Sequence, residues 1–519
     1  MEYVLLPQPP PRAQKAPKEN TQRKVIPMKQ RRLLSLLLAL ALLAGCAPAA
    51  EPPASPSPTP VSTSTPTPEP TPTPAPEPTH APEPVDFREF LDGVNAARKA
   101  IATREEPIEL PAEYTPDFSG QNHTFTEEEM ERLTTPHEAE ENLDKEGLLA
   151  DVDTFFLLLQ TTYGAYYYFG GDDTFFPIRD AVKEELAGAQ APTVKTLEDA
   201  LYRHLPPVLV DGHFMIGRYA PRDAFAKYMY YVPDLYLNSA ESAENPGYIK
   251  PTIGPDGRIC YWYAALSHDG SDLPDTLDGN PLNWNRAFSV NVNGGNAPAF
   301  SESEWEGVPV LTSRSMRDRG ENADASKQAL QRLADCGGEY ADSPLLIFDL
   351  RDNSGGNDKY INNWFRDWSG AKGGSRSLWI LRYSQLSCRL FSHYSANYIG
   401  AYHVFSSPAT WADRSGPVFV LQDKGVASSG ESAVENFRTA ADVLFVGGPT
   451  LGCALTPNNI RLYLPHSGLS CYFGTGLAFC ETDENRDGVG FLPDLWVAPA
   501  QAMVLTKKLI EYYGLNVEP

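Results

Sequence analysis

The sequence is poor in basic residues and lacks closely spaced cysteines. It has 43 Lys and Arg against 67 Asp and Glu, a formal net charge of −24 over 519 residues. This balance argues against nucleic acid as a partner and against electrostatic adhesion to anionic lipid. The seven cysteines include no C-x-x-C pair and no zinc-ligand spacing, so the sequence predicts neither a zinc site nor another cofactor. Cys471 and Cys480 flank a glycine-rich turn, and a disulfide between them is one alternative.

An apolar run long enough to span a membrane is also missing. Residues 28–46 read MKQRRLLSLLLALALLAGC, a basic start followed by a short apolar stretch, which predicts a secretory signal. The ending resembles a bacterial lipobox, in which the cysteine, here Cys46, is acylated. An ordinary signal peptide with a chance cysteine is the alternative. Residues 1–27 precede a good start at Met28 and are interpreted as a misassigned start.

Large apolar residues are nearly absent from residues 47–85, a tract of Pro, Thr, Ser and Glu. Such a tract cannot bury a core and is typical of an extended, disordered linker. Together with the signal, it predicts a bacterial lipoprotein held by lipid on Cys46 at the extracytoplasmic face of the cell membrane.

The remaining residues divide into three regions by pattern. Residues 86–213 carry apolar residues at helical spacing and predict an N-terminal helical region. Residues 214–335 show short, aromatic-rich runs separated by turn residues, which predict a β-rich cap. Residues 336–519 alternate strand-like and helix-like segments, which favours an α/β core.

Two adjacent serines are candidate nucleophiles. In KGVASSGESA (424–433), Ser428 and Ser429 lie where an apolar strand turns into a helix. Free N–H groups at a helix start stabilise developing negative charge. Serine needs a base to take its proton and donors for the oxyanion. The alternative is a plain N-cap, with Glu431 or Ser432 as its capping partner.

Two further segments carry candidate chemistry. DLRDNSGG (349–356) ends a hydrophobic strand in Gly355 and Gly356, whose N–H groups can form an anion cradle. LVDGHF (209–214) places His213 after an apolar run and an Asp-Gly turn. Taken singly, the first is an ordinary turn and the second a structural histidine.

Taken in order, these elements resemble the C-terminal processing (tail-specific) serine peptidases and their tricorn-like relatives. The resemblance rests on DGHF (211–214), DLRDNSGG (349–356), ASSGE (427–431), VGGPTLG (446–452) and DGVGFLPD (487–494). It implies a ClpP/crotonase-like α/β core, Ser428 as nucleophile, and an oxyanion hole formed by Ser429 with Gly355 or Gly356. No segment resembles the Gly-Leu-Gly-Phe loop of a PDZ domain, which many members carry, so no PDZ domain is expected.

The base departs from the common family pattern. Many members use a lysine about 25 residues after the serine, and Cys453 stands there in this chain. The tricorn-like branch, which includes nisin resistance proteins, uses the histidine of the Asp-Gly-His element, here His213. A downstream carboxylate then supports the site, and the candidates are Glu481, Glu484 and Asp487. Lys424 is a remote alternative base, and loss of activity is the other interpretation of the missing lysine.

One segment has a rival interpretation. The residues DENRDGVGFLPD (483–494) resemble a calcium-binding loop, with Asp483, Asn485, Asp487 and Asp494 as oxygen ligands. Asp rather than Glu at the last position and the preceding Pro493 oppose this interpretation. The same residues are explained by the family's terminal element.

The sequence thus predicts a membrane-anchored, extracytoplasmic serine endopeptidase that hydrolyses unfolded polypeptides or peptide tails by a Ser/His mechanism. The alternative is an inactive family member that binds peptides or apolar ligands, since the fold is reused in that way and the middle region is aromatic-rich. A cell-wall scaffold is a third interpretation, which rests only on the linker.

Overall fold

The computed structural model describes residues 85–118, 124–241, 244, 246–290, 297–318, 323–374, 376–408, 410–480 and 485–516. The signal, the linker and Cys46 lie outside these residues. Within them, no helix combines the length and the apolar character needed to cross a membrane.

The core is a six-stranded sheet in the order β18-β14-β13-β10-β9-β8. All neighbouring pairs are parallel except the edge pair β8–β9. The strands are β8 Phe300–Trp305, β9 Val308–Ser313, β10 Leu346–Asp349, β13 Val418–Gln422, β14 Val443–Gly447 and β18 Leu495–Trp496. Parallel strands need crossovers, which explains why their sequence alternates with helices. The predicted α/β fold is confirmed.

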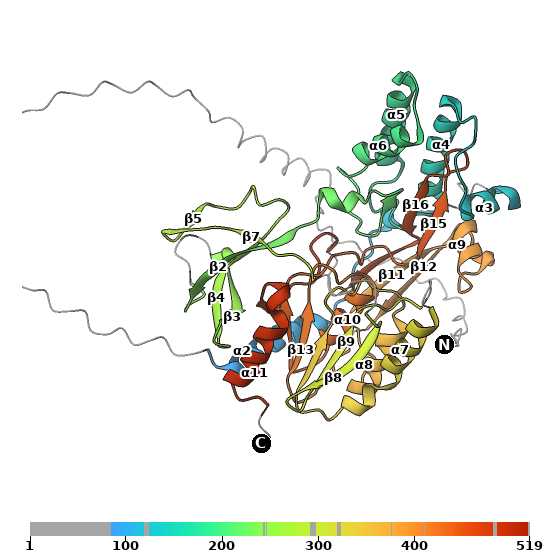
Figure 1. Ribbon diagram of the computed structural model, residues 1–519. Coiled ribbons are helices and arrows are strands. Elements are labelled where there is room, and N and C mark those ends of the chain that lie inside the picture. Colours follow the sequence, from blue (N-terminus) through green and yellow to red (C-terminus); the bar gives the residue numbers. More distant parts are fainter. Residues whose placement is uncertain are drawn as a thin grey trace, which may run out of the picture. The chain divides into compact units, whose positions relative to one another are not determined.

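Helices cover both faces of this sheet, as Figure 1 shows. On one face, α7 Ala323–Asp335, α8 Lys359–Ser369 and α10 Ser429–Phe437 share a hydrophobic cluster with Phe348. On the other face, α2 Phe87–Ala102 and α11 Ala502–Tyr512 pack with Ile347. Adjacent residues of a strand point to opposite faces, so a strand buried on both sides becomes a continuous apolar run.

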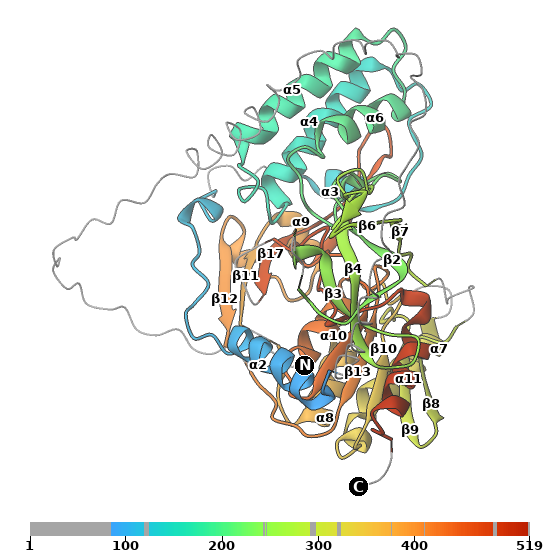
Figure 2. The ribbon, with the colours of Figure 1, turned by 90° about the vertical axis from the view of Figure 1, so that its left-hand side faces the viewer.

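Two smaller sheets pack against the predicted helical region. Helices α4, α5 and α6 gather at the top of Figure 2, and their apolar residues share one cluster with both sheets. The orders are β1-β16-β15 and β12-β11-β17, with α9 following β11. The elements are α3 Glu127–Thr134, α4 Lys145–Thr162, α5 Asp172–Gly188, α6 Val194–His204, α9 Gln385–Leu390, β1 Met215–Ile216, β11 Ser377–Arg382, β12 Tyr402–Ser407, β15 Asn459–Tyr463, β16 Ser470–Gly474 and β17 Gly476–Cys480. Cys471 and Cys480 are not bonded to each other, so the disulfide considered above is not formed.

The cap is a four-stranded antiparallel sheet in the order β3-β4-β2-β7, with a separate hairpin β5–β6. Its strands are β2 Tyr228–Leu237, β3 Ile249–Ile253, β4 Ile259–Ser267, β5 Thr276–Leu277, β6 Asn280–Pro281 and β7 Asn285–Arg286. Strands β8 and β9 fall inside the segment assigned to the cap by pattern, but β9 pairs with β10 in the core sheet. The local pattern of a strand does not specify its partner, and this explains the difference.

The sheet core generates a stability prediction. The Phe348 side chain is 0 % exposed and its ring lies 4.9 Å from Trp364 and 5.0 Å from Phe437, centroid to centroid. We expect Phe348→Ala to lower the free energy of unfolding by about 3–5 kcal/mol, measured by urea denaturation. Phe288→Ala is the matched control because that ring is 71 % exposed, and its change should stay within about 0.5 kcal/mol. Equal effects of the two substitutions would contradict this packing.

Candidate active site

Three loops meet at one edge of the core sheet. Strands β10, β13 and β14 run parallel, so their carboxyl ends lie side by side. The loop after β10 carries Gly355 and Gly356, the loop after β13 carries Ser428, and the segment after β14 carries Cys453. The topology therefore gathers elements that are far apart in the sequence.

Ser428 is held in a strained turn. It is the N-cap residue of α10, with φ 53° and ψ −123°, a conformation that non-glycine residues rarely adopt. Strain of this kind costs on the order of 1–3 kcal/mol and clusters at functional sites. The residue is partly exposed, whereas Ser429 after it is buried. A sharp strand-to-helix turn presents a serine hydroxyl outward, which suits a nucleophile.

The glycine loop lies directly against this turn. A Cβ added at Gly355 would meet the Ala427 carbonyl oxygen at 2.6 Å and the Ser428 Cβ at 2.9 Å. The Gly355 N–H already donates to Asn353 Oδ1 at 3.0 Å. Among the described residues, no acceptor is found for the N–H groups of Gly356 and Ser429. This arrangement favours Gly356, rather than Gly355, as the partner of Ser429 in an oxyanion hole.

Glu431 connects the serine turn to the segment after β14. Its carboxylate accepts hydrogen bonds from the N–H groups of Ser428 at 3.3 Å, Gly452 at 2.9 Å and Cys453 at 2.8 Å, and from the Thr450 hydroxyl at 2.5 Å. The glutamate of the Ser-x-x-Glu element is thus a buried anchor. It fixes the backbone of the nucleophile turn.

Cys453 lies between the serine turn and the Asp-Gly-His element. Its N–H and that of Ser428 donate to the same oxygen of Glu431, and burial raises the pKa of its thiol well above the ordinary value. A Cβ added at Gly212 would lie 2.5 Å from the Cys453 Cβ. Gly212, the residue before His213, therefore packs against Cys453. This contact places the Asp-Gly-His turn against Cys453, whose N–H shares the Glu431 carboxylate with the N–H of Ser428.

His213 has an unusual environment. Both ring nitrogens are buried, and neither has a hydrogen-bond partner among the described residues. Burial, with a smaller contribution from the charge of Arg222, lowers the pKa of the imidazole from 6.5 to about 4. Arg222 donates to the Gly212 carbonyl at 2.8 Å. Buried polar atoms are usually paired, so an orphaned imidazole indicates a group that awaits a substrate or a water molecule.

Two buried carboxylates hold the Asp-Gly-His turn. Asp487 accepts from the N–H groups of Gly212 at 2.7 Å, Ala454 at 2.9 Å and Leu455 at 3.1 Å. Asp211 accepts from the His213 N–H at 2.8 Å. Burial raises the pKa of both carboxyl groups, and their mutual repulsion raises that of Asp487 further. Asp487 therefore contacts the backbone next to His213. The Asp487 oxygens accept from backbone N–H groups and not from the imidazole ring of His213.

The other predicted residues are placed as follows. Glu481, Glu484 and Asp483 lie outside the described residues. Asn485 donates to the Val210 carbonyl at 2.8 Å, and Asp494 accepts from Arg98 at 2.6 Å. Within the described part of the chain, no group of three His, Cys, Asp or Glu side chains could hold a metal ion.

Lys424 is tied down by backbone carbonyls. Its ammonium donates to Thr450, Leu451, Gly488 and Val489 at 3.0–3.3 Å. Burial lowers its pKa to about 8. These contacts clamp two loops together, a structural role that the sequence did not suggest.

Asp423 is a second residue that the sequence analysis missed. Its carboxylate accepts from the N–H groups of Asp352 and Gly425 at 2.9 Å, and of Val290 at 2.8 Å. It therefore joins the glycine loop, the serine loop and the end of the cap. The only sequence signal was its place at the end of a buried strand.

Part of the chain matches a known protein family. The model of peptidase family S41 matches residues 308–497. No curated protein matches the sequence. Among solved structures, the chain is similar to mature CPAF (13% identity, TM-score 0.41, 71% of this chain and 96% of that one). It is also similar to the photosystem II D1 C-terminal processing protease (14% identity, TM-score 0.34, 68% of this chain and 93% of that one). A third similar structure is a lipoprotein from Streptococcus agalactiae (13% identity, TM-score 0.34, 71% of this chain and 96% of that one).

The glycine loop generates a prediction with a built-in control. Gly355 (φ 91°) and Gly370 (φ 68°) both have left-handed backbones, but only an added Cβ at Gly355 collides with backbone atoms; at Gly370 it meets no described atom within 4 Å. We expect Gly355→Ala to slow labelling of Ser428 by a fluorophosphonate about a hundredfold, because the added Cβ would displace the Ser428 turn and the Ser429 N–H proposed as an oxyanion donor. Gly370→Ala should slow labelling little while lowering thermal stability through backbone strain. Equal labelling rates for the two variants would show that the glycine loop does not affect the reactivity of Ser428.

Proposed function

We propose that this protein cleaves peptides, with Ser428 as nucleophile and His213 as base. Its residues 308–497 match the model of peptidase family S41, a serine-type family. The observation that carries the proposal is the meeting of three features. These are a strained serine at a helix start, two unpaired N–H groups beside it, and an imidazole without a partner, joined to the serine turn through Cys453.

The proposed reaction has two stages. The Ser428 hydroxyl oxygen attacks the peptide carbonyl carbon while His213 takes the hydroxyl proton. The N–H groups of Ser429 and Gly356 donate to the oxyanion. His213 then protonates the departing amine as the C–N bond breaks and the acyl-enzyme forms. A water molecule, deprotonated by His213, hydrolyses the ester and regenerates the serine.

The chain would belong to the histidine-dependent, tricorn-like branch that also contains nisin resistance proteins. Cys453 stands where other members carry the lysine, and its buried thiol is a poor base because burial disfavours the thiolate. The lipobox at Cys46 and the Pro/Thr linker support attachment to the outer face of a bacterial membrane. Unfolded polypeptides or peptide tails would be the substrates, with no cofactor.

The nucleophile and base are tested together. A complex peptide mixture is incubated with the protein and cleavage is followed by mass spectrometry. We expect Ser428→Ala and His213→Ala each to reduce cleavage about a thousandfold or more, as losses within one catalytic unit do. Ser429→Ala, which keeps the backbone N–H, should retain most cleavage, and the exposed His403→Ala is the matched histidine control.

Each contrary outcome has a definite meaning. If His213→Ala still cleaves the peptides, another residue acts as the general base, and Lys424 would be tested next. The absence of cleavage by the well-folded parent would overturn the peptidase proposal and favour an inactive, ligand-binding member.

The lowered pKa of His213 predicts the pH dependence. A general base must be neutral, and this imidazole takes up its proton near pH 4 instead of 6.5. We expect kcat/KM to stay constant from pH 7 to about 5 and then to fall tenfold per pH unit. Arg222→Gln removes a cation that opposes protonation, so its acidic limb should move to higher pH. A parent acidic limb centred near 6.5 would show that the imidazole is solvated as in a free peptide.

The same shift has a consequence for stability. The unfolded chain protonates this histidine below pH 6.5, whereas the folded chain does so only near pH 4. Stability is therefore lost as the pH falls between these two values.

A further inference from the structure

Two arginines near the proposed site have no acidic partner. Arg317 and Arg461 are exposed, and within the described residues neither guanidinium forms an ion pair. In a chain with a net charge of −24, carboxylates are plentiful. Within the described residues, Arg317 and Arg461 nevertheless keep their charges free, and their positions decide what they could do.

Arg317 belongs to the oxyanion side of the site. The residue before it, Met316, forms a parallel bridge with Gly356, and a Cβ added at Gly356 would lie 2.4 Å from the Arg317 nitrogen. The Arg317 N–H donates to Ser315 Oγ at 3.1 Å, which fixes the local turn. The side chain therefore starts next to the proposed oxyanion donor.

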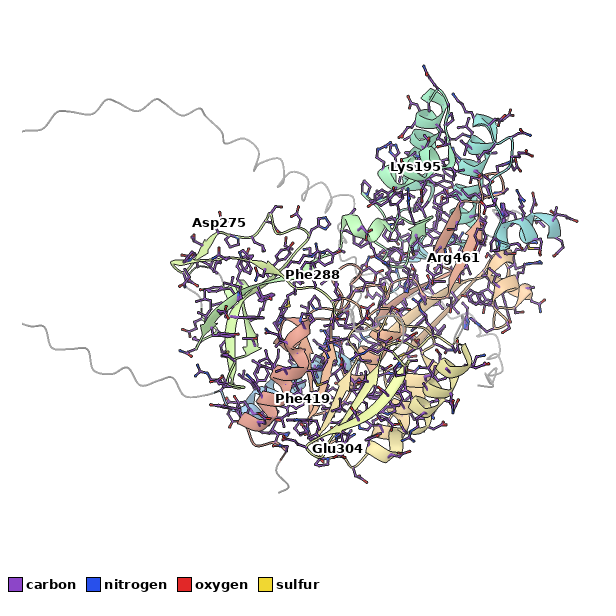
Figure 3. The ribbon with its side chains drawn as sticks, in the orientation of Figure 1. Lys195, Asp275, Phe288, Glu304, Phe419 and Arg461 are labelled. Atoms are coloured by element: carbon purple, nitrogen blue, oxygen red, sulfur yellow. The ribbon has the colours of Figure 1, made fainter. Side chains whose placement is uncertain are left out.

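Arg461 belongs to the histidine side. Across the sheet β1-β16-β15, Met215, Tyr472 and Arg461 stand opposite one another and so share a face. Their neighbours Ile216, Cys471 and Leu462 are buried against the helices, so the shared face is the outer one. Met215 is two residues after His213. The Arg461 guanidinium lies 5.2 Å from the centre of the Tyr472 ring, and Figure 3 labels Arg461 on this strand.

The two guanidinium groups act on the same place. Tyr472 is half-buried, and burial raises its pKa, while the charges of Arg461 and Arg317 both oppose that shift. The thiol of Cys453 and the carboxylate of Asp211 act on the same phenol. Tyr472 stands between Met215 and Arg461 on the outer face of the sheet, and the charges of both arginines act on its phenol.

We propose that Arg317 and Arg461 bind a carboxylate of the substrate close to the scissile bond. Guanidinium groups pair with carboxylates through paired N–H donors, and these charge-assisted bonds are stronger than neutral ones. The carboxylate belongs either to a Glu or Asp side chain or to the end of the peptide. This inference rests on the proposed function for the meaning of its site, and it adds a substrate class.

The test uses one peptide, chosen from those that the parent cleaves or, failing that, binds. It is made in four forms: Glu or Gln near the scissile bond, each with a free or amidated C-terminus. Binding is measured by fluorescence anisotropy on full-length Ser428→Ala, and kcat/KM on the parent. Each is repeated with Arg317→Ala plus Arg461→Ala. The control is Arg104→Ala, an exposed arginine at the end of α2.

We expect one carboxylate form to bind and react about tenfold to a hundredfold better than its neutral counterpart, as charged hydrogen bonds do. The double variant should lose this preference and show a weaker dependence on salt. A preference for Glu over Gln identifies a side chain, and a preference for the free acid over the amide identifies the C-terminus.

Two outcomes separate the inference from the function on which it rests. Cleavage without any charge preference overturns the carboxylate site and leaves the peptidase in place. Arginine-dependent binding of acidic peptides by a chain that cleaves nothing overturns the peptidase and leaves the site. Equal binding of all four forms to Ser428→Ala overturns the carboxylate site whatever the activity.

Discussion

The buried carboxylate of Glu431 is the contact on which the rest of the site depends. It holds the N–H of Ser428 together with the segment 450–453. That segment carries Cys453, against which the Asp-Gly-His turn packs. A carboxylate with four donors is well compensated for burial, whereas its removal would leave those donors without a partner. The strained conformation of Ser428 persists because this anchor and the packing of Gly355 over-determine it.

Buried carboxylates join neighbouring loops in the same way at two other places. Asp423 joins the glycine loop, the serine loop and the cap, and Asp487 joins the Asp-Gly-His turn to residues 454–455. In each case the donors are backbone N–H groups from loops that no secondary structure connects. Loops at the carboxyl edge of a parallel sheet have many unpaired N–H groups, and a buried carboxylate satisfies several of them at once. Part of this acidic chain's charge is therefore structural rather than a solvated surface.

The sequence predicted the fold class, but not the partner of every strand. The alternation of strands and helices from 336 onward indicated an α/β fold, because period-2 and helical patterns are local properties. The pairing of β9 with β10 was missed because sheet membership depends on contacts distant in the sequence. The anchoring roles of Lys424 and Asp423 were missed for the same reason. A lysine next to a glycine looks like a surface residue until the four carbonyls around its ammonium are known.

Electrostatics explains why a histidine rather than a lysine suits this site. The position after β14 is enclosed by Gly212, Ser428 and the Glu431 carboxylate, and a buried thiol fits there without charge. His213 is likewise neutral over most of the pH range, because burial and Arg222 oppose its protonation. The Lys424 ammonium is held by four backbone carbonyls, and burial lowers its pKa to about 8. Under the proposed function, a neutral imidazole is free to accept the serine proton, while the exposed Arg317 and Arg461 attract an anionic group of the peptide.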